Sequence, residues 1–266
     1  MYKNIELLAV RAGKIMLEAY GRVDSVNEKS SNSDIVTEYD VRIQNFLVEE
    51  LSKLYPDAKF LGEEGEKNGD DDSLFNGKLF IIDPIDGTTN FVRDYGKSAV
   101  SIALADKGEV IYGCCYNPYS EELFTASKNG GAFLNGKSIR CSCNDITHSV
   151  VSVGTTPYNK SEFADATFAI MRVLFDKAMD VRRFGSAVLD LLDVACGRSD
   201  MFCELRLSPW DYAAAGLIAT EAGALFTDMN GNKPGYDGRY SIIAANPSCY
   251  DYFMNSTEIR KYKNIF

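Results

Sequence analysis

The pattern of short apolar segments changes near residue 146, and this change constrains the fold more than any other feature of the sequence. Before it, segments rich in β-forming residues follow one another from about residue 98 to residue 126, separated only by turn signals. After it, short apolar segments alternate with helical periodicity. The sequence therefore predicts an antiparallel meander within an N-terminal α+β domain (1–146), followed by a C-terminal α/β domain (147–266).

Periodicity and turn residues place the individual elements. Apolar residues at helical spacing predict helices over 5–20, 34–54, part of 160–177, 186–196 and 209–222. Strands are predicted over 59–61, 79–82, 98–105, 110–116, 123–126, 150–153, 180–184 and 200–204, and near Leu225 and Ile242. The polar segment 29–33 is interpreted as a mobile loop or the tip of a hairpin.

Charge and hydropathy exclude two kinds of partner. The chain has 38 acidic and 28 basic residues, a net charge of −10, and no run of Lys and Arg longer than a pair. This balance argues against binding to nucleic acid. No apolar run approaches the ~18 residues of a membrane span, and the first residues lack a secretory pattern. We therefore expect a soluble, cytoplasmic protein with neither nucleic acid nor membrane as partner.

The histidine and cysteine content limits the kinds of catalytic and metal site that the chain can form. With His148 as the only histidine, Ser-His-Asp, Cys-His and histidine-ligated metal sites are poorly supplied. The seven cysteines are odd in number and lack C-x-x-C spacing, so we interpret them as small hydrophobic residues in a reducing compartment. Catalysis is therefore expected to depend on carboxylates, hydroxyls and hard cations.

The segment 79–91 carries the clearest chemical signal. An apolar strand leads to Asp83, Pro84 fixes a turn, and Asp86 and Gly87 come before a Thr-rich helix start. A helix start offers N–H groups to a phosphate, and two hard carboxylates suit Mg²⁺. A strand end followed by a capped helix would explain one of these carboxylates but not both.

Two other acidic sites are weaker signals when taken alone. Glu63 and Glu64 follow a strand-like segment, where an acidic loop would be an ordinary finding. Asp211 lies in the first turn after Ser208 and Pro209, where helix capping is a sufficient explanation.

Taken together, these motifs resemble the inositol monophosphatase family of Mg²⁺-dependent, Li⁺-sensitive phosphatases. The segments that carry the resemblance are Gly62-Glu63-Glu64, 83–91 and Pro209-Trp210-Asp211. Lys29 and the segments 34–40, 130–136 and 185–187 also fall in the order found in the family. The resemblance covers nearly the whole chain and implies an α/β (α+β) fold, a layered α-β-α-β-α sandwich of the sugar-phosphatase type.

The resemblance also implies a set of metal ligands. Glu63, Asp83 and the backbone carbonyl of Ile85 would hold one Mg²⁺. Asp83 would bridge to a second Mg²⁺, held also by Asp86 and Asp211, with two or three Mg²⁺ ions per active site. The ions would neutralise the phosphate and activate the attacking water without any histidine.

Catalytic and substrate-binding roles follow from the same resemblance. Thr88, close to Glu63 and backed by Asp40, would orient the attacking water, so these three residues form the implied catalytic set. The N–H groups of Gly87 and Thr88 would hold phosphate oxygens. The implied substrate-binding residues are Asp86, Gly87, Thr88, Gly185, Ser186, Ala187, Glu204 and Asp211.

The expected function is hydrolysis of inositol monophosphate, or of a similar small polyol or sugar phosphate, by a homodimer. The resemblance places the segment 155–159 on the substrate side, where the family varies, and the segment 205–207 lies between Glu204 and Asp211. These segments leave the sugar selectivity open. Fructose-1,6-bisphosphatase and 3′-phosphoadenosine 5′-phosphate phosphatase are alternatives that use the same metal core.

Two alternatives belong to other classes. The segment 83–88 partly resembles the D-x-D-G-T signature of haloacid-dehalogenase phosphatases, but two residues separate its acids instead of one, which would misplace the nucleophile and its acid/base partner. A catalytically silent, metal-binding regulatory protein is the non-enzymatic alternative. Phosphate release from inositol 1-phosphate in the presence of Mg²⁺ separates it from an enzyme.

Overall fold

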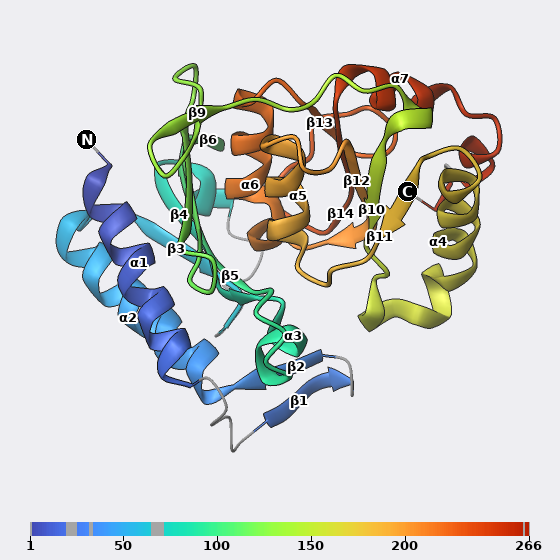
Figure 1. The fold of residues 1–266 in the computed structure, drawn as a ribbon. Coiled ribbons are helices and arrows are strands. Elements are labelled where there is room, and N and C mark those ends of the chain that lie inside the picture. Colours follow the sequence, from blue (N-terminus) through green and yellow to red (C-terminus); the bar gives the residue numbers. More distant parts are fainter. Residues whose placement is uncertain (1, 20–25, 32–33, 65–71, 263, 266) are drawn as a thin grey trace.

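The computed structural model describes residues 2–19, 26–31, 34–64, 72–262 and 264–265 and arranges them in five layers (Figure 1). A helix pair covers one face of a seven-stranded sheet, a second pair fills the space between that sheet and a five-stranded sheet, and two further helices cover the outer face. The layered α-β-α-β-α arrangement is therefore confirmed. In the described part of the chain, no helix is both long and apolar enough to cross a membrane.

The first elements are α1 (Lys3–Glu18), β1 (Val26–Ser31), β2 (Asp34–Thr37) and α2 (Glu38–Leu54). β1 and β2 pair in antiparallel fashion. Of the segment 29–33, predicted as a mobile loop or the tip of a hairpin, residues 29–31 belong to β1, and residues 32–33 lie outside the described residues. The predicted helix start at residue 34 is wrong, because residues 34–37 form β2. The Thr37 hydroxyl accepts a hydrogen bond from the Tyr39 N–H at 3.2 Å, and Asp40 completes a capping box. This cap fixes the start of α2 at Glu38.

The seven-stranded sheet contains the predicted meander. Its strands, in order across the sheet, are β3 (Lys59–Gly62), β4 (Lys78–Asp86), β5 (Ala99–Asp106), β6 (Glu109–Asn117), β7 (Glu122–Ser127), β8 (Ala132–Leu134) and β9 (Lys137–Ile139). Only the pair β3 and β4 is parallel. Asn135 and Gly136 both have positive φ, as a two-residue hairpin turn between β8 and β9 requires. The short helix α3 (Thr88–Val92) follows β4.

The five-stranded sheet has the order β11 (Asp180–Arg182), β10 (Val150–Val153), β12 (Met201–Leu207), β14 (Tyr240–Ala245) and β13 (Leu225–Thr227). The helices of this half are α4 (Lys160–Phe175), α5 (Ala187–Ala195), α6 (Pro209–Glu221) and α7 (Pro247–Asn255). The predicted alternation of strands and helices is confirmed. α7 was not predicted, because it buries only Cys249 and Phe253 and so presents little apolar periodicity.

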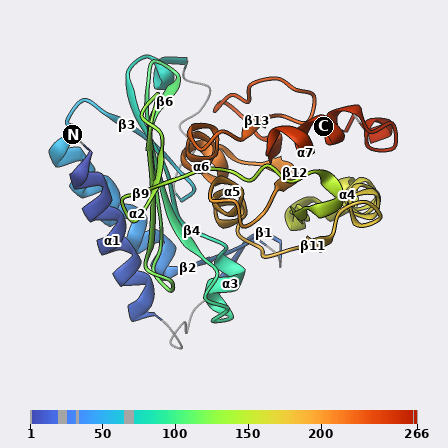
Figure 2. The same cartoon turned by 45° about the horizontal axis from the view of Figure 1, so that its top comes forward.

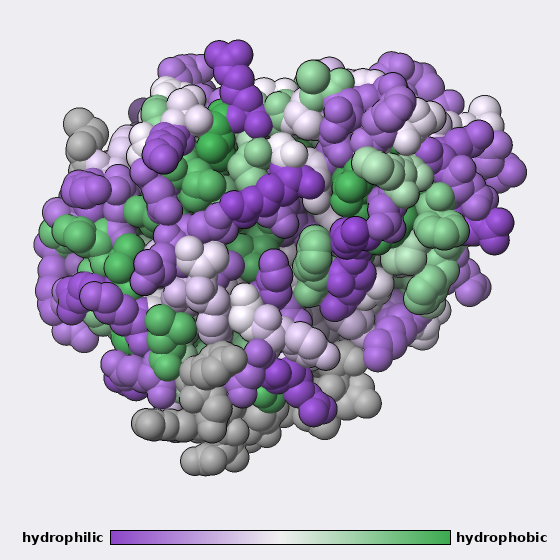
Figure 3. All heavy atoms as spheres, in the orientation of Figure 1, coloured by the Kyte–Doolittle hydropathy of each residue, from purple (hydrophilic) through white to green (hydrophobic). Residues whose placement is uncertain are grey.

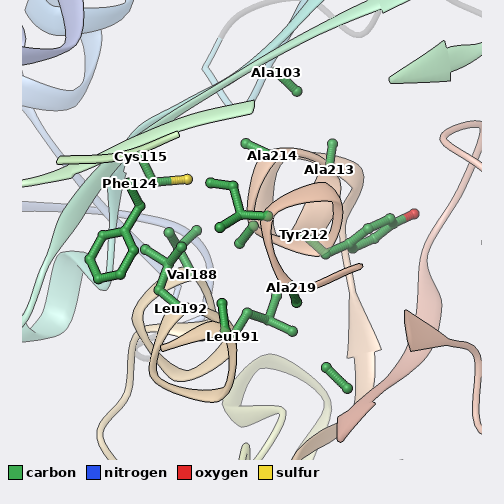
Figure 4. Packing of buried hydrophobic residues seen from close by; sticks show 14 of the residues in the cluster. Ala103, Cys115, Phe124, Val188, Leu191, Leu192, Tyr212, Ala213, Ala214 and Ala219 are labelled. Atoms are coloured by element: carbon green, nitrogen blue, oxygen red, sulfur yellow. The ribbon is translucent and has the colours of Figure 1, made fainter. Parts of the chain in front are cut away.

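The helix pair α5 and α6 forms the middle layer (Figure 2). Figure 4 shows Val188 and Leu192 of α5 beside Phe124 and Cys115 of the seven-stranded sheet. α6 lies so close to β6 that a Cβ added at Gly113 would be 2.6 Å from the carbonyl oxygen of Ala214. The middle layer is therefore packed by small residues in close contact.

The hydrophobic cluster around α5 and α6 joins residues from both sides of residue 146, such as Phe124 and Phe202. The division into domains 1–146 and 147–266 stays a prediction. All seven cysteines are unpaired; Cys143 is exposed, whereas four others are buried as expected. Hydrophilic residues predominate on the face drawn in Figure 3, in keeping with the net charge of −10.

Candidate active site

Three aspartates from two distant segments meet between the seven-stranded sheet and α6. Asp83 and Asp86 lie in the last part of β4, and Asp211 lies in the first turn of α6. One carboxylate oxygen from each residue lies within 4.8 Å of those of the other two. Asp83 and Asp86 are buried, with 1% and 7% of their surfaces exposed. The two segments singled out separately in the sequence thus contribute to one site.

Each of these aspartates is oriented through one of its oxygens. Asp83 Oδ1 accepts a hydrogen bond from the Ile85 N–H at 3.0 Å, where the pairing of β4 with β5 is irregular. Asp86 Oδ2 accepts hydrogen bonds from the Ser186 hydroxyl and, at 3.1 Å, from the Val188 N–H. Asp211 Oδ2 accepts one from the Ser208 N–H at 2.7 Å. The fold therefore fixes the geometry of all three carboxylates.

The site strongly disfavours the charged form of its acids. Burial, followed by the charges of neighbouring acids, raises the pKa values of Asp83 and Asp211 well above their usual range. Burial raises the pKa of Asp86 to about 7, although the hydrogen bonds from Ser186 and Val188 oppose the shift. A hard divalent cation would relieve this repulsion, and carboxylate oxygens are the ligands that Mg²⁺ prefers. The donor set therefore fits Mg²⁺.

Glu63 lies near these aspartates but is not one of the three whose oxygens all lie within 4.8 Å. Its N–H donates to the carbonyl oxygen of Ile82 at 3.2 Å, which continues the pairing of β3 with β4. Its charge contributes to the raised pKa values of Asp83, Asp86 and Asp211. Glu63 is thus placed within electrostatic reach of the group.

Gln44 of α2, which was not predicted as a site residue, holds the chain beside Glu63. Its side-chain Oε1 accepts a hydrogen bond from the Glu64 N–H at 2.9 Å, and its Nε2 donates to the Glu64 carbonyl oxygen. A Cβ at Gly62 would collide with this carboxamide. The only signal in the sequence is that Gln44 follows Asp40 by four positions, on the same face of the helix.

Thr88 and Asp40 lie together, as the resemblance implied. The Thr88 hydroxyl is 3.2 Å from the carbonyl oxygen of Ile85 and 3.5 Å from Asp40 Oδ1. Asp40 is fully buried, and its other oxygen accepts hydrogen bonds from the Thr37 N–H at 2.8 Å and the Thr37 hydroxyl at 2.5 Å. Burial raises the pKa of Asp40 to about 7, against the effect of those hydrogen bonds. The Lys29 side chain lies outside the described part of the molecule.

Gly87 and the segment 185–187 are in direct contact. Gly87 is the N-cap of α3 with φ of 83°, and a Cβ there would lie 3.2 Å from the Gly185 carbonyl oxygen. Gly185 also has positive φ, at 88°. Ser186 is the N-cap of α5 and Ala187 is its first residue. The phosphate turn proposed from the sequence and the proposed substrate segment therefore lie side by side.

Glu204 of β12, which the resemblance assigns to substrate binding, is buried. Its Oε1 accepts a hydrogen bond from the Thr156 N–H at 2.7 Å. Burial raises the pKa of Glu204 to about 7, opposed by this hydrogen bond and by the positive charge of Arg183. Thr156 has φ of 45°, an uncommon conformation for a β-branched residue. The backbone is thus held in a strained conformation beside Glu204.

Two further residues at the site were missed in the sequence. The Arg183 guanidinium donates to the Thr155 hydroxyl from Nε at 3.3 Å and from Nη2 at 3.0 Å, and its position just before the segment 185–187 is the signal that the sequence offers.

The second of these residues, Asp190 of α5, is buried, and its Oδ1 has no hydrogen-bond partner among the described residues. Burial raises the pKa of Asp190 well above its usual range. The sequence does not indicate that Asp190 is buried, because an aspartate between apolar helical positions can also be exposed.

A model of the inositol monophosphatase family matches residues 1–261. The chain belongs to the inositol monophosphatase family. It is 38% identical over 244 residues to an inositol monophosphatase of Dictyostelium discoideum, covering 89% of this chain and 87% of the relative. It is equally 38% identical over 249 residues to the Nus factor SuhB of Escherichia coli K12, covering 92% and 91%.

Solved structures of family members share the fold. An IMPase of Thermotoga maritima superposes with a TM-score of 0.87 at 32% identity, over 99% of this chain and 98% of that one. The extragenic suppressor protein suhB of Bartonella henselae superposes with a TM-score of 0.86 at 35% identity, over 96% of both chains. The family and fold implied by the sequence motifs are thereby confirmed.

Proposed function

We propose that this protein is a Mg²⁺-dependent phosphomonoesterase that hydrolyses inositol monophosphate or a similar small polyol or sugar phosphate. Membership of the inositol monophosphatase family supports this proposal. The observation that carries it is the convergence of the buried Asp83 and Asp86 with the partly buried Asp211, whose charges repel one another, in a geometry suited to a hard cation.

In this proposal two or three Mg²⁺ ions occupy the site. Glu63, Asp83 and the Ile85 carbonyl would hold one ion, and Asp83, Asp86 and Asp211 would hold another. When bound, Mg²⁺ supplies positive charge to the phosphate and to the leaving oxygen and acidifies the attacking water. The orienting hydrogen bonds from Ser186 and Ser208 keep the carboxylates in place before any ion arrives.

The catalytic set Glu63, Thr88 and Asp40 positions the water. Thr88 Oγ1 accepts a hydrogen bond from the water while its own proton points to the Ile85 carbonyl oxygen or to Asp40. The water oxygen attacks phosphorus, the bond from phosphorus to the alcohol oxygen breaks, and a proton released by the attacking water passes to that oxygen. No covalent bond between protein and phosphate is needed.

The substrate lies against two contiguous surfaces. The N–H groups of Gly87 and Thr88 hold phosphate oxygens at the start of α3. The alcohol part faces the segment 185–187 and Glu204, with Asp86 and Asp211 at the ester oxygen. Li⁺ sensitivity, a homodimeric assembly and a cytoplasmic location follow the family resemblance and are part of this proposal.

Phosphate release from inositol 1-phosphate, measured with Mg²⁺ and with or without Li⁺, tests the function. A panel including fructose 1,6-bisphosphate, 3′-phosphoadenosine 5′-phosphate and glycerol phosphates then identifies the preferred alcohol. Asp83→Asn removes the bridging charge and is expected to lower kcat by about a thousandfold or more. Asp251→Asn, at an exposed acid of α7, is the matched control. Turnover by Asp83→Asn at the wild-type rate would refute the assigned role.

A non-enzymatic role is the second candidate, because relatives at 38% identity carry the name Nus factor SuhB. Under this alternative the acidic group binds a cation for structural or regulatory purposes. Absence of phosphate release from every monoester in the panel, with Mg²⁺ binding retained in calorimetry, would favour it over the phosphatase.

A further inference from the structure

We propose that Arg183 forms a binding site for a second anionic group in the alcohol part of the substrate. The preferred substrates would then be phosphomonoesters that also carry a phosphate or a carboxylate. This inference rests on the proposed phosphatase function and narrows its substrate class.

The guanidinium of Arg183 has hydrogen-bonding capacity to spare. Of its five N–H groups, one on Nε and one on Nη2 donate to the Thr155 hydroxyl. The remaining three lie on Nη1 and Nη2. Within the described ranges, no carboxylate forms an ion pair with Arg183, whereas the neighbouring Arg182 pairs with Asp180 at 2.5 Å. The Arg183 guanidinium therefore has three further N–H groups that can donate to an anionic ligand.

The position of Arg183 links the two surfaces assigned to the substrate. Its Nη1 lies against Gly185, whose carbonyl oxygen in turn lies against Gly87 in the phosphate turn. Its anchor, Thr155, precedes Thr156, which donates to Glu204. A ligand that reaches from Gly87 toward Glu204 consequently passes the guanidinium.

Arg183 contributes a positive charge next to a group of acids. The strongest influences on the pKa values of Asp83, Asp86 and Asp211 are burial, other acids and hydrogen-bond donors. Arg183 is the basic side chain that acts on Glu204, where it favours the charged form. A second anion on the substrate would meet repulsion from the acids unless a fixed cation received it, and an arginine fork suits phosphate and carboxylate oxygens.

A competing explanation is that Arg183 only offsets the charge of Glu204. In that case the charge of the alcohol part would have no bearing on turnover. Two matched substrate pairs separate the explanations: 2-phosphoglycerate against glycerol 2-phosphate, and fructose 1,6-bisphosphate against fructose 1-phosphate. The first pair differs by a carboxylate and the second by a phosphate.

In the wild-type protein we expect kcat/KM to be about tenfold or more higher for the doubly anionic member of at least one pair, mainly through a lower KM. The pair that shows the preference identifies the anion. Arg183→Gln should bring this ratio close to one, and Arg183→Lys should give an intermediate ratio, because it keeps the charge but loses the fork. Arg182→Gln is the matched control and should keep the wild-type ratio. Added salt should lower the ratio in the wild type, because it screens an exposed pair.

Equal kcat/KM values within both pairs, unchanged by Arg183→Gln, would overturn the inference while leaving the phosphatase intact. If the wild type hydrolyses none of the four compounds, calorimetric titration of the same compounds into the Mg²⁺-loaded protein decides the inference, and the proposed function fails only if inositol 1-phosphate and the other monoesters of the panel are also left intact. Tighter binding of a doubly anionic member by the wild type, lost in Arg183→Gln, would still support the anion site. Equal binding would overturn it.

Discussion

At the scale of single residues, the acids of the site also begin helices. Asp40 and Asp211 complete the capping boxes of α2 and α6, and Asp86 accepts the Val188 N–H in the first turn of α5. The unpaired N–H groups and partial positive charge of a helix start stabilise a carboxylate. Capping and metal binding are therefore compatible explanations of Asp211, since one oxygen caps the helix and the carboxylate has a second oxygen that can bind a cation.

Gln44→Leu tests whether the Gln44 side chain keeps the segment beside Glu63 in position. The variant keeps the volume of the side chain but removes both hydrogen bonds to the Glu64 backbone. We expect the Mg²⁺ concentration for half-maximal activity to rise about tenfold, with a much smaller change in the KM for the phosphomonoester, because a loosened Glu63 weakens the metal site. Binding of Mg²⁺ measured by calorimetry should weaken in parallel.

Glu49→Gln, at an exposed position on the same helix, is the control and should show the Mg²⁺ dependence of the wild type. If Gln44→Leu also binds Mg²⁺ as the wild type does, Gln44 supports the fold alone and has no part in placing Glu63.

At the scale of elements, the packing of α6 on β6 connects stability with the site, because α6 carries Asp211. Gly113→Ala would bring a Cβ to 2.6 Å from the Ala214 carbonyl oxygen, so the helix must move away from the sheet. We expect the free energy of unfolding to fall by about 1–3 kcal/mol, as for other overpacked cores, and activity to fall with it. Chemical denaturation measures the first effect and phosphate release the second.

Gly77→Ala is the control for this variant, since nothing lies within 4 Å of the added Cβ. It should be close to neutral, because replacing glycine by alanine in an unstrained position does not itself destabilise. Equal stability of Gly113→Ala and the wild type would show that α6 and β6 can separate without loss.

Much of this element structure could be predicted from the sequence, for physical reasons. The meander and the helices α5 and α6 follow from periodicity, and the caps at Ser186 and Ser208 mark where those helices begin. Residues 34–37 form β2 instead of the predicted helix, because they precede α2 directly and the helix begins only after the cap at Thr37. A local sequence pattern does not show which distant group a polar side chain will contact. The positions of Gln44 and Arg183 are therefore visible only in the three-dimensional structure.

At the scale of the whole molecule, the site joins parts of the chain on both sides of residue 146. Asp83 and Asp86 come from the seven-stranded sheet, whereas Asp211 and Glu204 come from α6 and the five-stranded sheet. The shared hydrophobic cluster around α5 and α6 keeps these parts in fixed positions relative to each other. Binding of a cation to acids from both parts should consequently stabilise the molecule as a whole.

The pH dependence of this stabilisation can be predicted from the raised pKa values. Asp40, Asp86 and Glu204 have pKa values of about 7 in the folded protein, against about 4 in an unfolded chain. Between these values the metal-free folded protein binds more protons than the unfolded chain, so its free energy of unfolding falls as the pH rises. In the proposed function Mg²⁺ binds the ionised carboxylates, so its stabilising effect should grow over the same range.

We therefore expect the difference in Tm between samples with saturating Mg²⁺ and with EDTA to be small near pH 5 and to reach several degrees by about pH 8. Differential scanning calorimetry across this range provides the measurement. Asp86→Asn removes one of the titrating ligands and should reduce the difference at about pH 8. A difference that stays constant with pH would mean that cation binding is not coupled to the ionisation of these buried acids, because ions bound to carboxylates already charged at pH 5 displace no protons.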